Sequence, residues 1–418
     1  MKIEIITIGN ELLSGKTINS NAQYLCKTLL KFGYSTLYTS VYQDEKKELV
    51  NGIKIALKRA DLLIITGGLG STIDDNTKKI VTNFLKIDLK FSEDIAADIE
   101  KRFGCIASIE EQATIPKSGD VFKNEIGTAP GFAFINSGKA LILLPGVPVE
   151  LEDMFEKHGL AFIQKNFPLK EKDFQEIINI CLLPEIKIDN LLRTIDLPDD
   201  VTLGIYPSAG FVQVSLTTKA LNKNEAIKKI SDIKNKINLE FADYIYISED
   251  GKIERAIHDL LIKNDEKIAF AESCTGGALS SKIVAIAGAS KCFLGSFITY
   301  SNDLKKNILK VSEKTLSDHG AVSIPTVKEM IKGVFNLTDA TYAIAISGIA
   351  GPSGGSAEKP IGTISLAIAK RGDEIDVGFL HLRGSLKGTR SMIIESVVNI
   401  AFGILYRKIA HNLTYFVK

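Results

Sequence analysis

Two side chains that can act as nucleophiles are adjacent at Ser273 and Cys274, within the stretch AESCTGG. The apolar run KIAF precedes this stretch, and Thr275, Gly276 and Gly277 open a helical pattern. Backbone N–H groups at such a turn can stabilise an oxyanion or a phosphate. A cysteine at a helix start is expected to have a lowered pKa, which favours the thiolate. The residue types alone therefore leave both nucleophiles open.

Candidate bases for these nucleophiles follow in the stretch FITYSNDLK. Tyr300 ends an expected strand, and Lys305 lies about one helical turn further on. A lysine with a lowered pKa can deprotonate serine, directly or through a tyrosine hydroxyl. A cysteine nucleophile needs a histidine instead, and no spacing singles one out. The alternative is that the tyrosine packs on the core and the lysine is solvated.

A second group of residues suited to chemistry follows the apolar run DLLIIT, in GGLGSTIDD. The glycines allow the backbone to approach a ligand and to point N–H groups at a phosphate. Asp74 and Asp75 beside such a cradle suit a divalent cation. An ordinary turn with an acidic helix start would show the same residues. GNELLSG, which contains Glu11, and LPGVP, which contains Gly146, are weak signals by themselves.

Three regions of different pattern must position these stretches. Residues 1–165 alternate apolar runs with helical patterns, which predicts a doubly wound, mostly parallel α/β sheet. Residues 166–250 predict a small α+β module, with two helices and a hairpin around Pro207 to Gly210. Residues 251–418 return to α/β alternation. The candidate residues follow strand ends, where open α/β sheets bind ligands.

Composition excludes several classes of protein. The 418 residues carry a net charge of +1, which does not favour a general binder of nucleic acid or membrane surfaces. Five cysteines without a CxxC pair suit a reduced, cytoplasmic protein rather than a disulfide framework or a zinc site. We find no apolar run of about 18 residues and no signal-peptide pattern, so no membrane partner is expected.

The stretches GNELLSG, TGGLGSTIDD and LPGVPVELEDM together resemble the N-terminal domain of the CinA family (competence/damage-inducible protein A), which is related to molybdopterin-binding domains. The sequence departs from the family pattern at Asn10, Ser71 and Leu151. The resemblance implies hydrolysis of ADP-ribose to AMP and ribose 5-phosphate, with Mg or a transition metal such as Co as the divalent ion. It implies Asp74 or Asp75 as metal ligands and, for the substrate, Gly67, Gly68, Gly70, Thr72, Glu11 and Gly146.

The stretches AESCTGG, TYSNDLK, DHGAVS and SGIAGPSGG…KPIGT resemble the nicotinamide mononucleotide deamidase domain, the C-terminal half of CinA proteins. That activity hydrolyses a carboxamide to a carboxylate and ammonia, without a cofactor. The resemblance implies Ser273 as nucleophile, Tyr300 and Lys305 as its activators, and Cys274 as a bystander. The substrate-binding residues it implies are Glu272, Thr275, Gly276, Gly277, Ser347, Gly348, Gly351, Gly354, Gly355 and Arg390.

The stretch LRGSLKGTR departs from the family's FxGDRxxVR pattern. Arg390 aligns with the last arginine, and Arg383, Lys387 or Arg390 must replace the missing one, or activity is reduced. Two alternatives therefore stay open. One is that a single activity is retained; the other is a non-catalytic nucleotide-binding protein linked to competence or DNA damage.

The middle region resembles the KH-type module of the same family. It lacks the GxxG loop with which KH domains clamp nucleotides, and its charge is close to neutral. Nucleic acid is therefore not expected as a partner, and we expect a spacer or dimer-contact role. The resemblance implies a homodimer.

Overall fold

The computed structural model describes residues 1–72, 75–104, 108–382 and 389–416. The chain divides into two compact units. The first contains Met1–Gln175 with Thr217–Lys228, and the second contains Glu176–Leu216 with the chain from Lys229 onward. Each unit is described by itself below. In the described ranges, none of the helices combines the length and the apolar character needed to cross a membrane.

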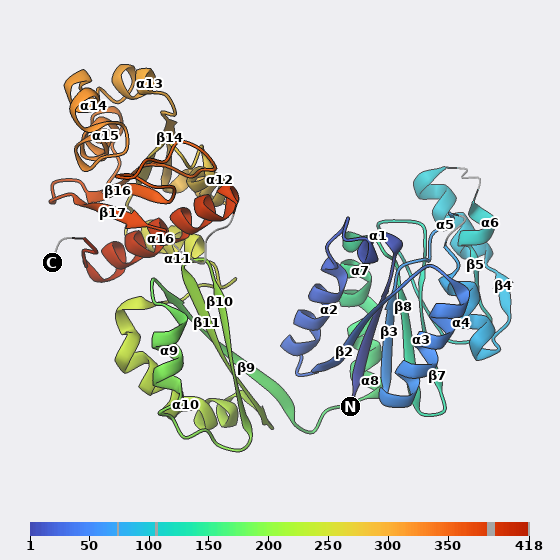
Figure 1. Ribbon diagram of the computed structural model, residues 1–418. Helices are drawn as coiled ribbons and strands as arrows, with labels where there is room; N and C mark the ends of the chain where they lie inside the picture. Colours follow the sequence, from blue (N-terminus) through green and yellow to red (C-terminus); the bar gives the residue numbers. More distant parts are fainter. Residues whose placement is uncertain (73–74, 105–107, 383–388, 417–418) are drawn as a thin grey trace. The chain divides into compact units, whose positions relative to one another are not determined.

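The first unit contains a mixed sheet in the order β2-β1-β3-β8-β7-β6. Strands β2, β1, β3 and β8 run parallel, and β7 and β6 are antiparallel additions. Helices α2, α7 and α8 cover one face and α3 and α4 the other (Figure 1). The strands are β1 (Ile3–Ile8), β2 (Thr36–Tyr42), β3 (Leu62–Thr66), β6 (Asp120–Phe122), β7 (Gly131–Asn136) and β8 (Lys139–Leu144); the helices are α2 (Ser20–Lys31), α3 (Lys46–Arg59), α4 (Thr77–Leu85), α7 (Pro148–Met154) and α8 (Leu160–Asn166).

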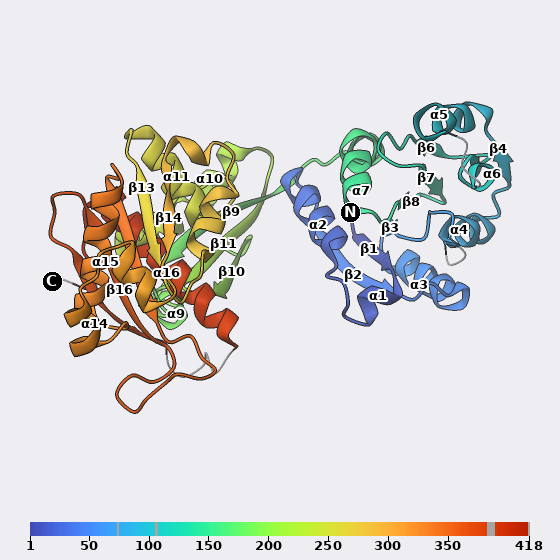
Figure 2. The same ribbon diagram turned by 90° about the horizontal axis from the view of Figure 1, so that it is seen from above.

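Three strands of the parallel core, β1, β3 and β8, are mostly apolar, whereas the edge strand β2 is partly exposed. All six residues of β1 and all five of β3 are buried, as expected for strands covered on both faces. A smaller group of elements lies beside α4 (Figure 2). It consists of β4 (Leu89–Phe91), α5 (Glu93–Phe103), α6 (Ile109–Gln112) and β5 (Thr114–Pro116); the short helix α1 (Asn10–Leu13) follows β1, and a π-helical turn (Phe155–Gly159) joins α7 to α8.

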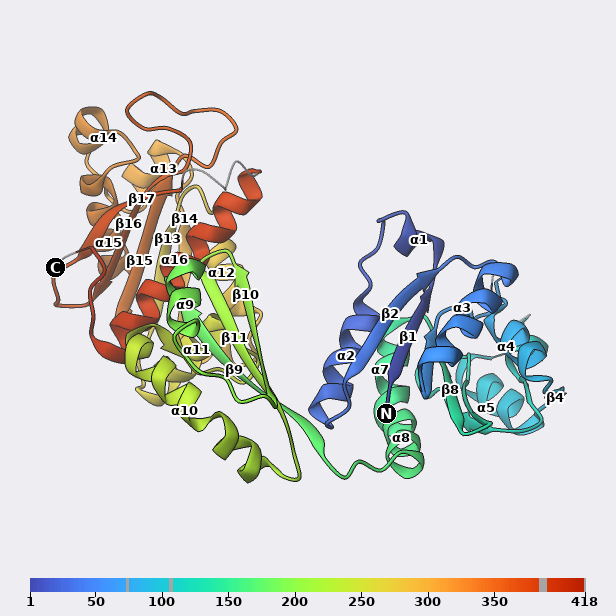
Figure 3. The same cartoon turned by 60° about the horizontal axis from the view of Figure 1, so that its bottom comes forward.

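The middle region forms a four-stranded sheet in the order β10-β11-β9-β12, backed by two helices (Figure 3). The expected hairpin and both helices are present, but the sequence patterns missed two strands. The first half of β9 is partly exposed and rich in charged residues, so it lacks apolar alternation, and β12 has two residues. The elements are β9 (Lys172–Cys181), α9 (Glu185–Leu192), β10 (Val201–Ser208), β11 (Phe211–Ala220), α10 (Lys223–Phe241), a 3₁₀ turn (Ala242–Tyr244) and β12 (Ile245–Tyr246).

The C-terminal part of the second unit contains a sheet in the order β14-β13-β15-β16-β17. Strands β14, β13 and β15 are parallel, and β16 and β17 add an antiparallel hairpin. Figure 1 shows α11, α12 and α16 on one face and α13, α14 and α15 on the other. The elements are α11 (Ile253–Lys263), β13 (Ile268–Glu272), α12 (Ala278–Val284), β14 (Phe293–Ile298), α13 (Asn302–Asn307), α14 (Glu313–His319), α15 (Ile324–Leu337), β15 (Tyr342–Gly348), β16 (Thr363–Lys370), β17 (Asp376–His381) and α16 (Arg390–His411), with a 3₁₀ turn (Ala289–Lys291) before β14.

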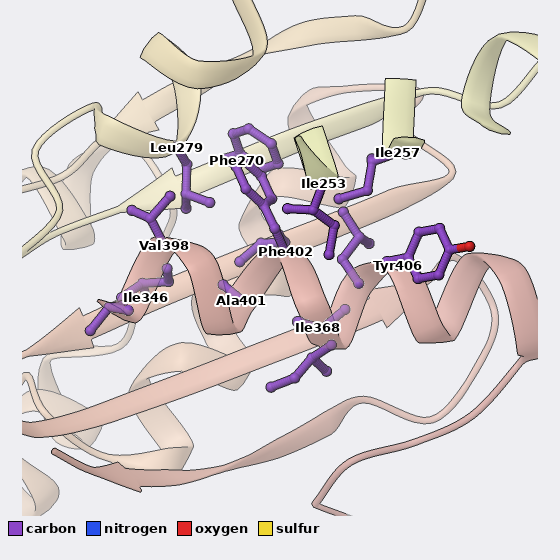
Figure 4. Packing of buried hydrophobic residues seen from close by; sticks show 14 of the residues in the cluster. Ile253, Ile257, Phe270, Leu279, Ile346, Ile368, Val398, Ala401, Phe402 and Tyr406 are labelled. Carbon is purple, nitrogen blue, oxygen red and sulfur yellow. The ribbon is translucent and has the colours of Figure 1, made fainter. Parts of the chain in front are cut away.

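Helix α16 is buried along most of its length because it lies between this sheet and α11. Phe402 is fully buried and packs against Phe270 of β13, with ring centroids 6.3 Å apart. Ile253 and Ile257 of α11 belong to the same apolar cluster (Figure 4). Burying a large apolar side chain contributes roughly 1.5–3 kcal/mol. This packing fixes β13, which carries the candidate nucleophile at its end.

Candidate active sites

Ser273 and Lys305 meet at the carboxyl end of β13. Lys305 Nζ donates a hydrogen bond to Ser273 Oγ at 3.0 Å. The sheet register produces this contact: Glu272 is paired with Ile298 of β14, and Thr299 N donates to the carbonyl of Glu272 at 2.8 Å. The chain then turns into α13, which returns Lys305 toward the end of β13. The proximity predicted between serine and lysine is confirmed.

Lys305 is buried, with 1% of its surface exposed. Besides Ser273 Oγ, its amine contacts the carbonyls of Thr299 at 2.8 Å and Tyr300 at 3.3 Å. Burial lowers the pKa of Lys305, since desolvation disfavours the ammonium form. Among the described residues no carboxylate forms an ion pair with it. The neutral amine, which can accept a proton from serine, is therefore more populated near pH 7 than in an ordinary lysine.

Cys274 points into the apolar core rather than toward Lys305. It is 6% exposed and belongs to the cluster that contains Leu279 and Ile364. Desolvation raises the pKa of Cys274 to about 12. The expectation of a lowered cysteine pKa is therefore wrong for this position, because burial outweighs the helix start and the nearby cations Arg390 and Lys305. Cys274 is a thiol at neutral pH.

Glu272 lies on the face of β13 opposite Ser273 and is fully buried. Its carboxylate accepts hydrogen bonds from the backbone N–H groups of Gly277 and Leu279, at 2.9 and 3.2 Å. It also accepts from the N–H and hydroxyl of Ser280 and from the hydroxyl of Ser296. The sequence suggested a substrate contact here. The structure instead gives Glu272 a positioning role, because both oxygens of its carboxylate accept hydrogen bonds, mostly from the start of α12.

The backbone donors of the nucleophile turn are only partly available. Gly276 N donates to the carbonyl of Ser273 at 3.1 Å, and Gly277 N donates to Glu272. Within the described residues, no hydrogen bond engages the N–H groups of Cys274 and Thr275. Of the three N–H groups expected as oxyanion donors, those of Gly276 and Gly277 are therefore engaged, and that of Thr275 has no partner in the described ranges. The hydroxyl of Thr275 is buried and likewise without a partner in the described part of the chain.

Tyr300 does not join Lys305 to Ser273 through its side chain. It is 59% exposed, and its hydroxyl accepts a hydrogen bond from Arg390 Nη2 at 2.9 Å. Arg390 Nη1 donates to the carbonyl of Gly351 at 2.8 Å. The first residue of α16 therefore ties the loop after β15 to the end of β14. Direct contact of Lys305 with Ser273 is the arrangement observed, rather than a relay through the phenol.

The end of β15 lies next to the nucleophile. Ser273 N donates to the carbonyl of Ile346 at 3.0 Å, so Ser347 follows at the level of Ser273. Gly348 faces Cys274, where a Cβ would lie 3.2 Å from the sulfur. The loop beyond it contains the glycines suggested for phosphate binding; Gly351 and Gly354 have φ values of 74° and 88°, and Gly354 and Gly355 are exposed. Residues 383–388, with Arg383 and Lys387, lie outside the described residues.

A second candidate site lies in the first unit, at the carboxyl ends of β1, β3 and β8. Here Glu11 and Gly146, both expected substrate-binding residues, line one hollow of about 110 Å³. Asn21 of α2 also lines it, and its Nδ2 donates to Thr66 Oγ1 at 3.1 Å and to the carbonyl of Gly146 at 2.8 Å. Sequence reasoning missed Asn21 and Thr66. The only signal was their place beside a strand end and a helix start.

The glycine-rich loop after β3 is held by its own bonds. Gly67 and Gly68 have φ values of 108° and 66°, which side chains rarely adopt. Asp75 Oδ2 accepts hydrogen bonds from Thr72 N at 3.0 Å and from Thr72 Oγ1 at 2.5 Å. A Cβ added to Gly70 would collide with this carboxylate. The loop can therefore approach a phosphate, while the Thr72 hydroxyl is engaged within the loop.

A metal ion is less well supported by this loop. Among the described residues no group of three or more His, Cys, Asp or Glu side chains could hold one. Asp75 is a single carboxylate, and the other expected ligand, Asp74, lies outside the described residues. A single carboxylate can bind Mg²⁺ only where phosphate oxygens of the substrate complete the coordination of the ion. The metal therefore stays a prediction.

Comparisons with known proteins cover almost the whole chain. Family models match at residues 4–165 ("Probable molybdopterin binding domain"), 175–246 ("Damage-inducible protein CinA KH domain") and 250–409 ("CinA C-terminal domain"). A protein of Thermotoga maritima named CinA-like protein is 38% identical over 404 residues, which cover 94% of each chain. The crystal structure of the protein CinA from Thermoplasma acidophilum is 35% identical and covers 39% of this chain and 98% of its own, with a TM-score of 0.37.

Proposed function

The chain belongs to the CinA family, and from this premise we propose that its C-terminal domain is a serine amidohydrolase acting on the carboxamide of nicotinamide mononucleotide. The family membership rests on the comparisons above. The substrate and the reaction rest on the resemblance of AESCTGG, TYSNDLK and the SGIAGPSGG stretch to nicotinamide mononucleotide deamidases. The products of this reaction are nicotinate mononucleotide and ammonia.

One observation carries the proposal: a buried amine lies 3.0 Å from a serine hydroxyl, with no carboxylate neutralising it among the described residues. Structural lysines at this depth are normally paired with a carboxylate. Here the partners are a hydroxyl and two backbone carbonyls. Such an amine is suited to accept the serine proton, in the way that serine–lysine variants of the catalytic triad work.

The chemistry follows from these contacts. Lys305 takes the proton of Ser273, and Oγ attacks the carboxamide carbon to form a tetrahedral oxyanion. In this proposal the N–H groups of Cys274 and Thr275, which have no hydrogen-bond partner among the described residues, stabilise that charge. Lys305 then returns the proton to the departing nitrogen, ammonia leaves, and an ester on Ser273 remains. Water activated by the same amine hydrolyses this ester, releases the carboxylate and restores both groups.

For the N-terminal domain we propose hydrolysis of ADP-ribose to AMP and ribose 5-phosphate. The support is the hollow at the strand ends, in which Glu11 and Gly146 meet, together with the positive-φ glycines beside it. A divalent ion bound through Asp75 and substrate oxygens would neutralise the pyrophosphate and activate a water. The protein residues would bind the nucleotide and orient it.

Ammonia release from nicotinamide mononucleotide by the purified chain tests the first activity. Ser273→Ala should abolish it, and Cys274→Ala should keep most of it. An active Ser273→Ala protein together with an inactive Cys274→Ala protein would show that the nucleophile is the cysteine. Absence of turnover in the unaltered chain would favour the alternative of a binding protein or a lapsed site.

AMP formation from ADP-ribose, with and without EDTA, tests the second activity. Gly68→Ala is a suitable variant for this test. Gly68 has a φ of 66°, and an added Cβ would collide with the Thr77 hydroxyl. It should abolish AMP formation and leave ammonia release unchanged. Equal loss of both activities would contradict the assignment of two separate sites.

A further inference from the structure

The side chain of Asn399, on α16, joins three elements of the second unit. Its Oδ1 accepts a hydrogen bond from Lys282 Nζ of α12 at 2.8 Å. Its Nδ2 donates to the carbonyl of Ala209 at 2.7 Å. Asn399 is 4% exposed, and both of these bonds are satisfied within the protein. One buried amide therefore connects the middle region with two helices of the C-terminal sheet.

Ala209 belongs to the hairpin tip, by which we mean residues 208–211 between β10 and β11. The tip fits closely against α16: Gly210 has a φ of 84°, and a Cβ there would lie 3.3 Å from Asn399 Cβ and 3.4 Å from Ile400 Cγ1. The closed end of the hairpin lies beside α16 in Figures 1 and 3. Phe211 packs on the ring of Tyr246 in β12, with centroids 5.8 Å apart, and Tyr246 lies in turn against Tyr406 of α16, with centroids 5.9 Å apart.

The two helices that Asn399 joins both hold parts of the candidate site. Helix α12 begins directly after the nucleophile turn, and Glu272 binds its first N–H groups. Helix α16 begins at Arg390, which holds the carbonyl of Gly351 and the hydroxyl of Tyr300. A relative shift of α12 and α16 would therefore move the nucleophile with respect to the loop that faces it.

We propose that Asn399 is a positioning residue for the deamidase site and that the hairpin tip of the middle module is part of that site's support. The inference deepens the proposed amidohydrolase function and rests on it. The module then is more than the spacer or dimer contact that its sequence suggests. Because a misplacement of about 1 Å can cost roughly 100-fold in rate, a support outside the reacting groups can control turnover.

Three substitutions separate the bonds of Asn399. Asn399→Ala removes both. Asn399→Asp keeps an acceptor for Lys282 but loses the donor to Ala209, so it isolates the bond to the hairpin tip. Gly210→Ala disturbs the tip from the side of the module, where the added Cβ meets Asn399 and Ile400.

Arg407→Gln is the matched control. Arg407 Nε donates to the carbonyl of Asp243 at 3.0 Å, and its guanidinium lies 4.4 Å from the centroid of the Tyr244 ring. It is thus another contact of α16 with the middle module, but it lies 17 residues beyond Arg390, or about 25 Å along the helix. It should lower stability without changing the site.

In steady-state assays of ammonia release, the three test variants should lower kcat about tenfold or more, with KM changed by less than about threefold, since positioning acts on the transition state. The control should keep kcat within about twofold while its unfolding midpoint falls. Asn399→Asp with the kcat of the unaltered protein would overturn the role of the hairpin tip. Equal losses of kcat in Arg407→Gln and Asn399→Ala would reduce Asn399 to a stability residue.

Hydrogen–deuterium exchange separates this inference from the proposed reaction. The backbone amides of residues 273–280 should exchange faster in Asn399→Ala and Asn399→Asp than in Arg407→Gln, measured on full-length chains. This readout needs no turnover. If the unaltered chain releases no ammonia but exchange accelerates as described, the proposed function fails and the positioning role stands. If exchange is unchanged, the positioning role fails whatever the activity.

Discussion

Replacing Lys305 by methionine tests the central contact of the candidate site. Methionine keeps the length and the apolar stem of lysine, and it removes the amine that lies 3.0 Å from Ser273 Oγ. Loss of a general base typically lowers kcat by about 10²–10⁴-fold. We expect this fall in kcat at pH 7.5. In the unaltered protein kcat/KM should rise with pH as Lys305 loses its proton, and in the variant this rise should be absent. In the unaltered protein that rise should lie below the ordinary lysine pKa of about 10.4.

The same substitution has an effect on stability whose size depends on pH. Burial lowers the pKa of Lys305 in the folded state, so the unfolded chain binds more protons between that lowered pKa and about 10.4. In this window the free energy of unfolding rises with pH, by about 1.4 kcal/mol for each unit of pKa difference. The contribution is fully present above the unfolded pKa and is lost as pH falls through the window.

Lys305→Met removes this pH dependence and leaves two carbonyl acceptors, Thr299 and Tyr300, without the amine. Each unsatisfied buried group costs about 1–3 kcal/mol. The variant should therefore be less stable than the unaltered protein near pH 10. This deficit should shrink as the pH falls toward neutrality, which urea unfolding at a series of pH values measures directly.

Lys306→Met is the control for both measurements. Lys306 is the adjacent lysine, but it is partly exposed and forms ion pairs with Asp303 and Glu313. These partners raise its pKa, so its contribution to stability is present below the ordinary lysine pKa and is lost at higher pH, the opposite trend. Activity should not change. A Lys305→Met protein that keeps more than about a tenth of the kcat would refute the assignment of this amine as the base.

Three further substitutions have expected outcomes. Cys274→Ala should keep kcat within about threefold, since the side chain is a buried thiol; native Cys274 should also resist iodoacetamide at pH 8, and rapid alkylation of this residue would contradict its burial. Glu272→Gln should lower the free energy of unfolding by about 1–3 kcal/mol or more, because an amide cannot accept all the donors of α12 and Ser296; unchanged urea unfolding would argue against the positioning role. Tyr300→Phe should keep kcat within a few-fold and raise KM, as it removes one anchor of Arg390, and a loss as large as that of Lys305→Met would point to a phenol relay.

The sequence predicted the elements that are long and uniformly buried. Strands such as β1 and β3 are fully buried and mostly apolar, and α2 closes with Gly33 at a positive φ, as its sequence indicates. The sequence did not predict the strand β9, because pairing with neighbouring strands, rather than apolar alternation, stabilises its partly exposed first half. The two residues of β12 depend entirely on their antiparallel partners in β9.

The sequence predicted only those site residues that follow an expected strand. Glu11 and Gly146 follow different strands, and the parallel sheet brings them together because carboxyl ends of parallel strands share one edge. The sequence pattern does not predict where each side chain points or which other groups already occupy its hydrogen bonds. The bond from Arg390 to Tyr300, and the use of the Gly276 and Gly277 N–H groups inside their own turn, depend on packing of α12 and α16, which no local pattern encodes.

The choice between Ser273 and Cys274 shows how the fold decides chemistry that residue types leave open. The two residues follow β13 in a turn, and their side chains have different surroundings. One meets the amine of Lys305 on the side of α13, and the other meets the backbone of Gly348 inside the apolar core. A thiol is intrinsically the better nucleophile, but here desolvation holds it protonated. A lone buried amine, by contrast, is destabilised as a cation, so more of it is neutral near pH 7, and only the neutral form can accept the proton of the hydroxyl beside it. In the proposed mechanism the same burial therefore keeps the Cys274 thiol protonated and leaves the Lys305 amine able to act as the base for Ser273.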